Sequence, residues 1–150
     1  MRVLIGTDGS DDAIEAARRA VTLLATPDVV TVVCVTDTTS IETAGLESGF
    51  GGGIATPAEI QAVQQAATDS ANEALERTVA ALSTSAPVEQ RVEVGDTGPT
   101  LCYVAEETAA DVLVVGSRGR GRLRRALLGS VSSHVIHHAP CPVVIVRATE

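Results

Sequence analysis

Three glycines near the end of the chain follow an apolar segment at a spacing that can hold phosphate groups. Residues 111–116 (DVLVVG) end at Gly116, Gly119 follows after two residues, and Gly129-Ser130 follow after nine more. Glycine lets the backbone approach a ligand closely and permits the positive φ angles of a tight turn. A helix that starts at Gly129-Ser130 offers free N–H groups to an anion. This pattern fits a phosphate cradle, and it also fits an ordinary strand–loop–helix connection whose glycines only turn the chain.

Charged residues supply further candidates for a binding site. Asp8 directly follows the apolar residues 2–7 (RVLIGT), so it is either a ligand-binding carboxylate at a strand end or a solvated carboxylate before a helix. Five of the 11 basic residues are arginines between positions 118 and 125. One or two of them, Arg118 first, can reach a phosphate through paired hydrogen bonds. We expect the others to be solvated.

Several catalytic and metal-binding patterns are missing from the sequence. His134 and His138 lie four residues apart before Cys141, but no second pair of ligands has a matching zinc spacing. We therefore interpret these histidines as a favourable helix carboxyl end and assign no metal ligand among the side chains. All 11 basic residues are Arg, which excludes a Walker A loop and a lysine Schiff base. The Gly-x-Ser-x-Gly and His-Glu-x-x-His patterns and a complete Gly-x-Gly-x-x-Gly fingerprint are also absent.

Strand patterns alternate with helix patterns along the chain. Ser10 can cap a first helix, Thr56-Pro57-Ala58-Glu59 form a capping box for a second that runs to about Ser83, and Gly98-Pro99 open a third. A last helix covers Gly129 to His138, before Pro140. We predict strands over residues 2–7, 29–35, 88–94, 111–116 and 142–147. The alternation predicts an α/β fold with a doubly wound, Rossmann-like sheet of five parallel strands in the order 3-2-1-4-5. Ligands of such sheets bind beyond the carboxyl ends of the strands, here after strands one, two and four.

Length and composition limit the class of protein. A chain of 150 residues fits one domain, which we place over residues 1–150 with a flexible loop at 37–55, rich in Thr, Ser and Gly. The core must be aliphatic, because Phe50 and Tyr103 are the only aromatic residues. A net charge of −8 argues against general nucleic-acid binding. Three widely spaced cysteines, no signal-peptide pattern and no apolar stretch near the ~18 residues of a membrane span predict a soluble cytoplasmic protein.

The spaced glycines and both ends of the chain resemble the universal stress protein family. Gly116, Gly119 and Gly129-Ser130 are similar to the glycine motif of its ATP-binding members, and residues 3–10 (VLIGTDGS) resemble the family's opening strand and acidic turn. Residues 130–146 resemble its closing helix and strand. One departure is Gly6, where many binding members have Pro; we expect it to matter little, because that position contributes only contact surface.

The resemblance implies a role for each matching position. Asp8 is expected to accept hydrogen bonds from ribose hydroxyls or to lie beside the phosphates, and the backbone of Val35 to contact the adenine edge. The complete set that we assign to nucleotide binding is Gly6, Thr7, Asp8, Val35, Val115, Gly116, Arg118, Gly119, Gly129, Ser130, Val131 and Ser132. The expected ligand is ATP, AMP or ADP, with a Mg²⁺ ion that can bridge the phosphates.

Three kinds of function remain open at this point. The favoured one is a stress-response regulator that acts as a nucleotide-dependent switch. The others are a slow ATPase or autophosphorylating enzyme, for which no general base is evident, and a ligand-free scaffold. We expect a homodimer through residues 142–147, because this apolar strand should lie at a sheet edge. Neither a nucleic acid nor a membrane is expected as a partner.

The base is expected to be held without aromatic stacking. Tyr103 falls inside the third predicted helix and Phe50 in the glycine-rich loop, whereas Val35 and Val115 end the two central strands on either side of strand one. These two valines can lie on either side of the base. Backbone hydrogen bonds at Val35 would then favour adenine over guanine.

Overall fold

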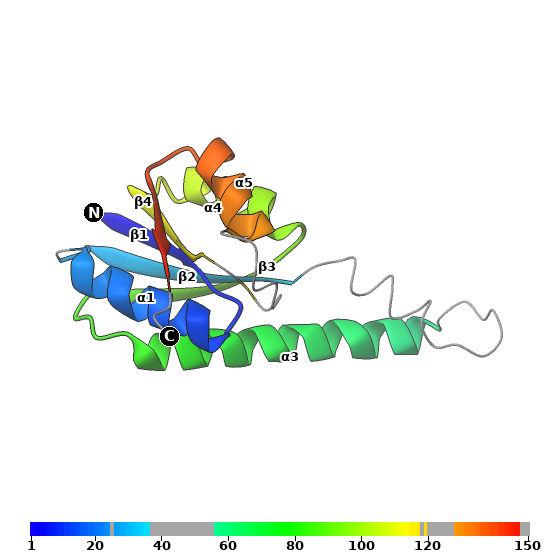
Figure 1. Cartoon of the computed structure of the whole chain (residues 1–150). Helices are drawn as coiled ribbons and strands as arrows, with labels where there is room; N and C mark the ends of the chain where they lie inside the picture. The colour runs from blue at the N-terminus through cyan, green and yellow to red at the C-terminus, as the bar shows by residue number, and fades with distance from the viewer. Residues whose placement is uncertain (25, 37–55, 118, 120–127, 148–150) are drawn as a thin grey trace.

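A five-stranded parallel sheet carries helices on both of its faces (Figure 1). The computed structural model describes residues 1–24, 26–36, 56–117, 119 and 128–147. In chain order the elements are β1 (Arg2–Gly6), α1 (Asp11–Leu23), β2 (Val29–Thr36), α3 (Pro57–Ala81), β3 (Val88–Val94), α4 (Thr97–Glu107), β4 (Val112–Gly116), α5 (Ser130–His138) and β5 (Val143–Val146). The strand order β3-β2-β1-β4-β5 and the parallel pairing confirm the prediction.

Two apolar clusters hold the helices to the sheet. Helices α1 and α3 cover one face and α4 and α5 the other (Figure 1). Side chains alternate along each strand, so Val3 and Ile5 of β1 pack with Leu75 of α3, and Leu4 packs on the opposite face with Leu101 of α4. Because both faces are covered, the central strands are apolar at nearly every position, as parallel sheets require.

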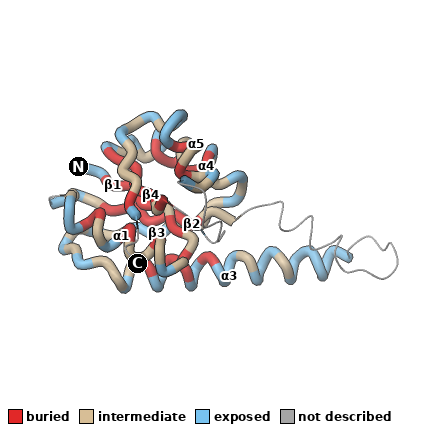
Figure 2. The backbone as a smooth tube through the Cα atoms, in the orientation of Figure 1, coloured by how far each residue is buried: buried red, intermediate tan, exposed pale blue. Residues whose placement is uncertain are grey.

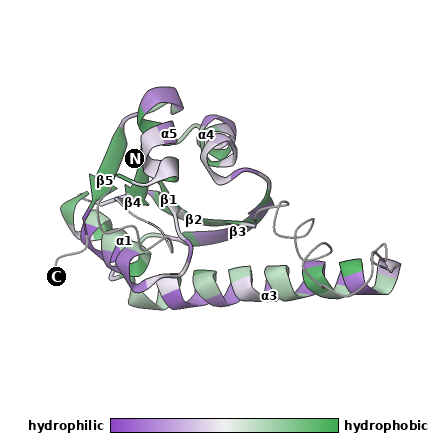
Figure 3. Cartoon of the chain, turned by 45° about the vertical axis from the view of Figure 1, so that its right-hand side comes forward, coloured by the Kyte–Doolittle hydropathy of each residue, from purple (hydrophilic) through white to green (hydrophobic). Residues whose placement is uncertain are grey.

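The two edges of the sheet differ in chemistry. Strand β3 contains three valines and four polar residues, and its polar character is visible in Figure 3. Strand β5 consists of three valines and one isoleucine, and it lies at the opposite edge. Both placements were predicted from the sequence patterns.

Helices α1 and α3 begin at the predicted caps, whereas α4 begins at Thr97, one residue before the predicted Gly98-Pro99. The Ser10 hydroxyl accepts a hydrogen bond from the Ala13 N–H, and Thr56 and Glu59 form the complete capping box at the start of α3. Helix α3 ends at Ala81, slightly before the predicted Ser83. Its first half projects past the sheet with mostly exposed residues (Figure 2). Ile60, a predicted apolar position of this helix, is therefore 40% exposed.

The core is aliphatic, as predicted. Tyr103 lies in α4 with 64% of its surface exposed, and Phe50 and the predicted loop 37–55 lie outside the described residues. Cys34 is buried, whereas Cys102 and Cys141 are half-buried against the cluster under α4 and α5. Among the described residues, no helix is both long and apolar enough to span a bilayer.

Candidate functional site

A cavity of about 490 Å³ opens at the carboxyl ends of β1, β2 and β4, where the strand order reverses. This volume is in the range that holds a small-molecule ligand. The predicted residues that line it are Gly6, Thr7, Asp8, Val35, Val115, Gly116, Gly119, Gly129, Ser130, Val131 and Ser132. The structure thus brings together every predicted site residue except Arg118, which lies outside the described residues.

The first arm of the cavity is the turn between β1 and α1. The Asp8 carboxylate accepts two hydrogen bonds through Oδ1, from the Ser10 N–H at 3.0 Å and from the Ser10 hydroxyl at 2.6 Å. The Ser10 oxygen in turn accepts from the Ala13 N–H and caps α1. On the other side, Asp8 Oδ2 lies 3.3 Å from where a β-carbon at Gly119 would stand. A carboxylate is therefore held at the cavity wall with the glycine of the second arm facing it.

The second arm consists of the end of β4 and the start of α5, and its contacts involve mainly the backbone. The Gly129 N–H donates to the Ser117 carbonyl at 2.9 Å. The Ser132 hydroxyl donates toward the carbonyls of Ser117 at 3.2 Å and Gly129 at 3.0 Å, so it fixes this arm internally. The N-cap residue of α5 is Gly129, and among the described residues no side-chain hydrogen bond caps this helix start. The first N–H groups of a helix lack acceptors within the helix, and they attract an anion.

Between the two arms the cavity wall is aliphatic. Val115 is 4% exposed, Leu101 is 2% exposed, and Val35 is half-buried. The described lining residues include no aromatic ring and one carboxylate, that of Asp8. Such a surface suits a flat apolar ring system, and its polar groups lie at the two arms.

The sequence analysis missed part of this wall. Thr97 and Leu101 come from α4, which follows β3, whereas the prediction named only residues after strands one, two and four. Ala13, Val33 and Leu128 complete the lining. A usable signal was present, because a helix that follows a parallel strand starts at the carboxyl edge of the sheet. Gly98-Pro99 marked that start in the sequence.

Gly6 shares space with two residues of the cavity. A β-carbon at Gly6 would lie 2.9 Å from Leu101 Cδ1 and 3.2 Å from Val115 Cγ1. These distances are shorter than ordinary van der Waals contact, so a side chain here must displace Leu101 or Val115. The expectation that Gly6 contributes only contact surface therefore leaves out this crowding.

The histidines of α5 do not form a metal cluster in the described part of the chain. The rings of His134 and His138 stack with centroids 4.2 Å apart, and His138 Nδ1 hydrogen-bonds the His134 carbonyl. Burial raises the pKa of the Cys102 and Cys141 thiols. Raised values keep both thiols protonated at neutral pH, which disfavours nucleophilic or metal-binding roles.

Comparison with known proteins agrees with the fold and indicates a family. A model of the universal stress protein family matches residues 1–147. Universal stress protein MJ0531 of Methanocaldococcus jannaschii is 29% identical over 97% of this chain and 81% of its own length. In several other curated members the match spans at most about half of the relative's length.

Two solved structures share this architecture. A universal stress protein in complex with cAMP is 29% identical, with a TM-score of 0.60 over 99% of this chain and 98% of that one. A family protein from Arabidopsis thaliana with AMP bound is 20% identical, with a TM-score of 0.67 over 99% and 92% of the two chains. From the family match over nearly all of its residues and from the shared fold, we conclude that this chain belongs to the universal stress protein family.

Proposed function

We propose that the cavity binds an adenine nucleotide, with the base between β2 and β4 and the phosphates at the start of α5. The observation that carries the proposal is one cavity that joins a fixed carboxylate, an aliphatic wall and a helix start whose N-cap residue is glycine. The cAMP-bound relative, at 29% identity, supports the ligand class.

The backbone at Val35 is suited to read the base. The Thr7 N–H donates to the Val33 carbonyl at 2.9 Å, so the backbone of Val33 faces β1. Backbone direction alternates along a strand, so Val35 faces the same side. The last register pair of β1 and β2 is Gly6 with Val33, and the Val35 backbone therefore points past the end of β1. We expect it to bond the adenine edge and to favour ATP over GTP by at least ~1 kcal/mol.

The two arms divide the remaining groups of the nucleotide. Asp8 can accept hydrogen bonds from the ribose hydroxyls, and the first-turn N–H groups of Ser130, Val131 and Ser132 can hold the phosphates. If Mg²⁺ accompanies ATP, its ligands would come largely from the phosphates, since Asp8 is the one carboxylate among the described lining residues.

Regulation through nucleotide occupancy is the form of function that we favour. Asp8, which contacts the ribose in this proposal, is the one acid–base side chain among the described lining residues, and no Lys, His or Arg accompanies it there to stabilise a transition state, which favours retention over turnover. A slow ATPase or autophosphorylating enzyme and a ligand-free scaffold stay as alternatives. Retained nucleotide with negligible release of phosphate would separate the switch from both.

The direct test is calorimetry on protein from which co-purified nucleotide has been removed. We expect ATP, ADP or AMP to bind with GTP weaker, and mass spectrometry of the released material to identify an adenine nucleotide. Asp8→Ala should weaken binding, and the exposed Asp69→Ala in α3 is a control that leaves it unchanged. A parent protein that binds none of these nucleotides would disprove the proposal.

We also propose a homodimer paired through the β5 edge. The Pro142 and Val146 carbonyls accept hydrogen bonds from the β4 side, so by alternation Ile145 faces outward. Ile145→Pro removes an outward N–H and no bond to β4, and it should convert the dimer to a monomer. Gln90→Pro at the outward side of β3 is the matched control. Light scattering that shows a monomeric parent at micromolar concentration would contradict the proposal.

A further inference from the structure

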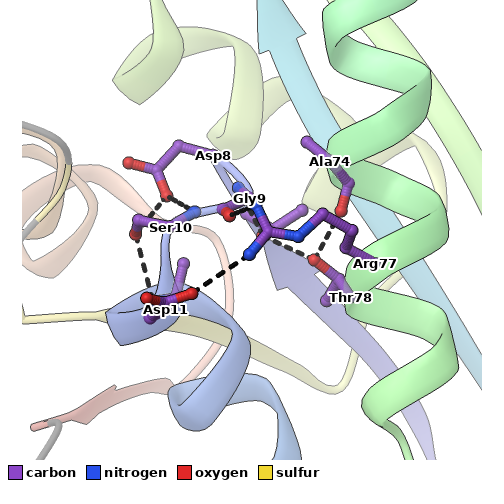
Figure 4. A network of polar contacts seen from close by, with 9 residues as sticks. Asp8, Gly9, Ser10, Asp11, Ala74, Arg77 and Thr78 are labelled. Atoms are coloured by element: carbon purple, nitrogen blue, oxygen red, sulfur yellow. Dashed lines mark hydrogen bonds and ion pairs between the residues drawn. The ribbon is translucent and has the colours of Figure 1, made fainter.

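A polar network with a buried centre joins the Asp8 turn to helix α3 (Figure 4). The Thr7 and Thr78 hydroxyl oxygens lie 2.9 Å apart, although the residues are 71 positions apart in the sequence. Thr7 is 8% exposed and Thr78 is fully buried. A buried hydroxyl that loses its partner costs about 1–3 kcal/mol, so this contact constrains both elements.

The direction of the hydrogen bonds in this network follows from the number of protons. The Thr78 hydroxyl donates its single proton to the Ala74 carbonyl at 2.7 Å. The Thr7 hydroxyl must therefore be the donor in the contact with Thr78. The Thr7 oxygen then accepts from the Gly9 N–H at 3.1 Å. One chain of bonds runs from the turn, through two hydroxyls, to the backbone of α3.

The carbonyl of Gly9 is also held, by a residue of α3. Arg77 donates to the Gly9 carbonyl at 3.0 Å and to Asp11 at 3.0 Å. Gly9 has a φ of +73°, and a β-carbon there would lie 2.5 Å from Ala74 Cβ. The turn therefore packs directly on the helix, and hydrogen bonds hold both the N–H and the carbonyl of Gly9.

Asp8 is the residue between these fixed points, and neither Arg77 nor Thr78 is among the described residues that line the cavity. We propose that Thr78 and Arg77 are positioning residues for nucleotide binding: helix α3 sets the direction of the Asp8 carboxylate without touching the ligand. This inference rests on the proposed function, in which that carboxylate contacts the nucleotide. Helix α3 then supports the site from outside the cavity.

The first test compares two threonines of α3. Thr78→Val keeps the shape and removes the hydroxyl, and we expect AMP and ATP to bind roughly five- to tenfold more weakly, as coupled neighbours do. Thr68→Val is the matched control, because the Thr68 hydroxyl makes the same bond to a helix carbonyl, that of Gln64, on an exposed surface. The control should bind like the parent. Equal affinity of the parent and Thr78→Val would overturn the proposal.

A second pair of variants remains informative if Thr78→Val does not fold. The Arg77 side chain is 59% exposed, so Arg77→Met should fold, and it removes the hydrogen bonds to the Gly9 carbonyl and to Asp11. We expect a weaker loss, roughly threefold. Arg18→Met, in the exposed pair with Glu15, is its control. In an Asp8→Ala background, Arg77→Met and Thr78→Val should cause no further loss of affinity, whereas a general structural effect would persist there and refute a role through Asp8.

A nucleotide-free measurement separates this inference from the proposed function. The carboxyl-carbon NMR shift of Asp8 and the hydrogen exchange of the Ser10 N–H both report the bond between these residues. We expect both to change in Thr78→Val and Arg77→Met and to stay at the parent values in the two controls. A parent that binds no nucleotide refutes the proposed function alone, whereas unchanged Asp8 and Ser10 signals in both variants refute positioning by α3.

Discussion

The two arms of the cavity achieve a fixed geometry in different ways. The turn after β1 is held by side chains, through Asp8 with Ser10 and through the contact of Thr7 with Thr78. The arm before α5 is held mainly by backbone acceptors, the carbonyls of Ser117 and Gly129. The first arm is vulnerable to the loss of a side-chain atom and to added volume at Gly9, which packs against Ala74, whereas the backbone contacts of the second arm persist in most substitutions. The two arms should therefore fail under different substitutions.

The largest expected effect is on the stability of the first arm. Gly9→Ala places a methyl group 2.9 Å from Ala74 Cα, and it puts a residue with a side chain into the left-handed conformation of Gly9. The steric contact and the backbone strain both destabilise the fold. We expect a loss of roughly 3 kcal/mol in the free energy of unfolding, measured in urea. Gly129→Ala in the second arm should lose under about 1 kcal/mol, because its φ of −76° suits any residue. Equal losses would mean that the turn does not pack on α3 as closely as described.

Bulk in the second arm should affect binding rather than stability. Gly129→Val sets a branched side chain at the start of α5, where it obstructs the phosphates. We expect at least about a tenfold loss of ATP affinity by calorimetry, equal to 1.4 kcal/mol, with the circular dichroism of the parent. Gly129→Ala should give a smaller loss. An unchanged affinity in Gly129→Val would remove the phosphate assignment from this arm.

A side chain at Gly6 tests the wall between the arms. The Gly6→Ala methyl group would lie 2.9 Å from Leu101 Cδ1, and the flexible end of that side chain can shift. We expect roughly a two- to fivefold change in the affinity for the adenine base, with a small loss of stability. The readout is the ratio of adenosine to ribose-5-phosphate affinity, since only the former fills the slot. A loss shared equally by both ligands would place the effect outside the base pocket.

The smallest effect concerns an exposed ion pair away from the cavity. Hydrogen bonds from Arg18 and Arg19 lower the pKa of Glu15 from 4.5 to about 2. A depressed pKa in the folded state contributes stability above pH 4.5 that is lost as the pH falls toward 2. Glu15→Gln should therefore make the free energy of unfolding less dependent on pH in this range and leave nucleotide affinity unchanged. A change in affinity would mean that Glu15 of α1 also influences the residues of the first arm.

Local patterns predicted most of the fold and most of the candidate site. Capping residues such as Ser10 and Thr56 bond to N–H groups three positions away, so the sequence alone locates the helix starts. The alternation of strand and helix patterns predicted the strand order, with β2 inside the sheet and β3 at its edge, as the structure has them. The glycine spacing located the second arm. The contacts of this arm are mainly backbone hydrogen bonds, so the positions of the glycines were enough to identify it.

Contacts between distant segments were decided only by the tertiary structure. The hydroxyls of Thr7 and Thr78 and the close approach of Gly9 to Ala74 depend on how α3 lies across β2 and against the first turn. No periodicity encodes that position, because the residues are about 70 apart and each pair exists only after the sheet is formed. Leu101 belongs to the cavity for the same reason: its α4 helix must first pack over the end of β1, beside the space left by Gly6.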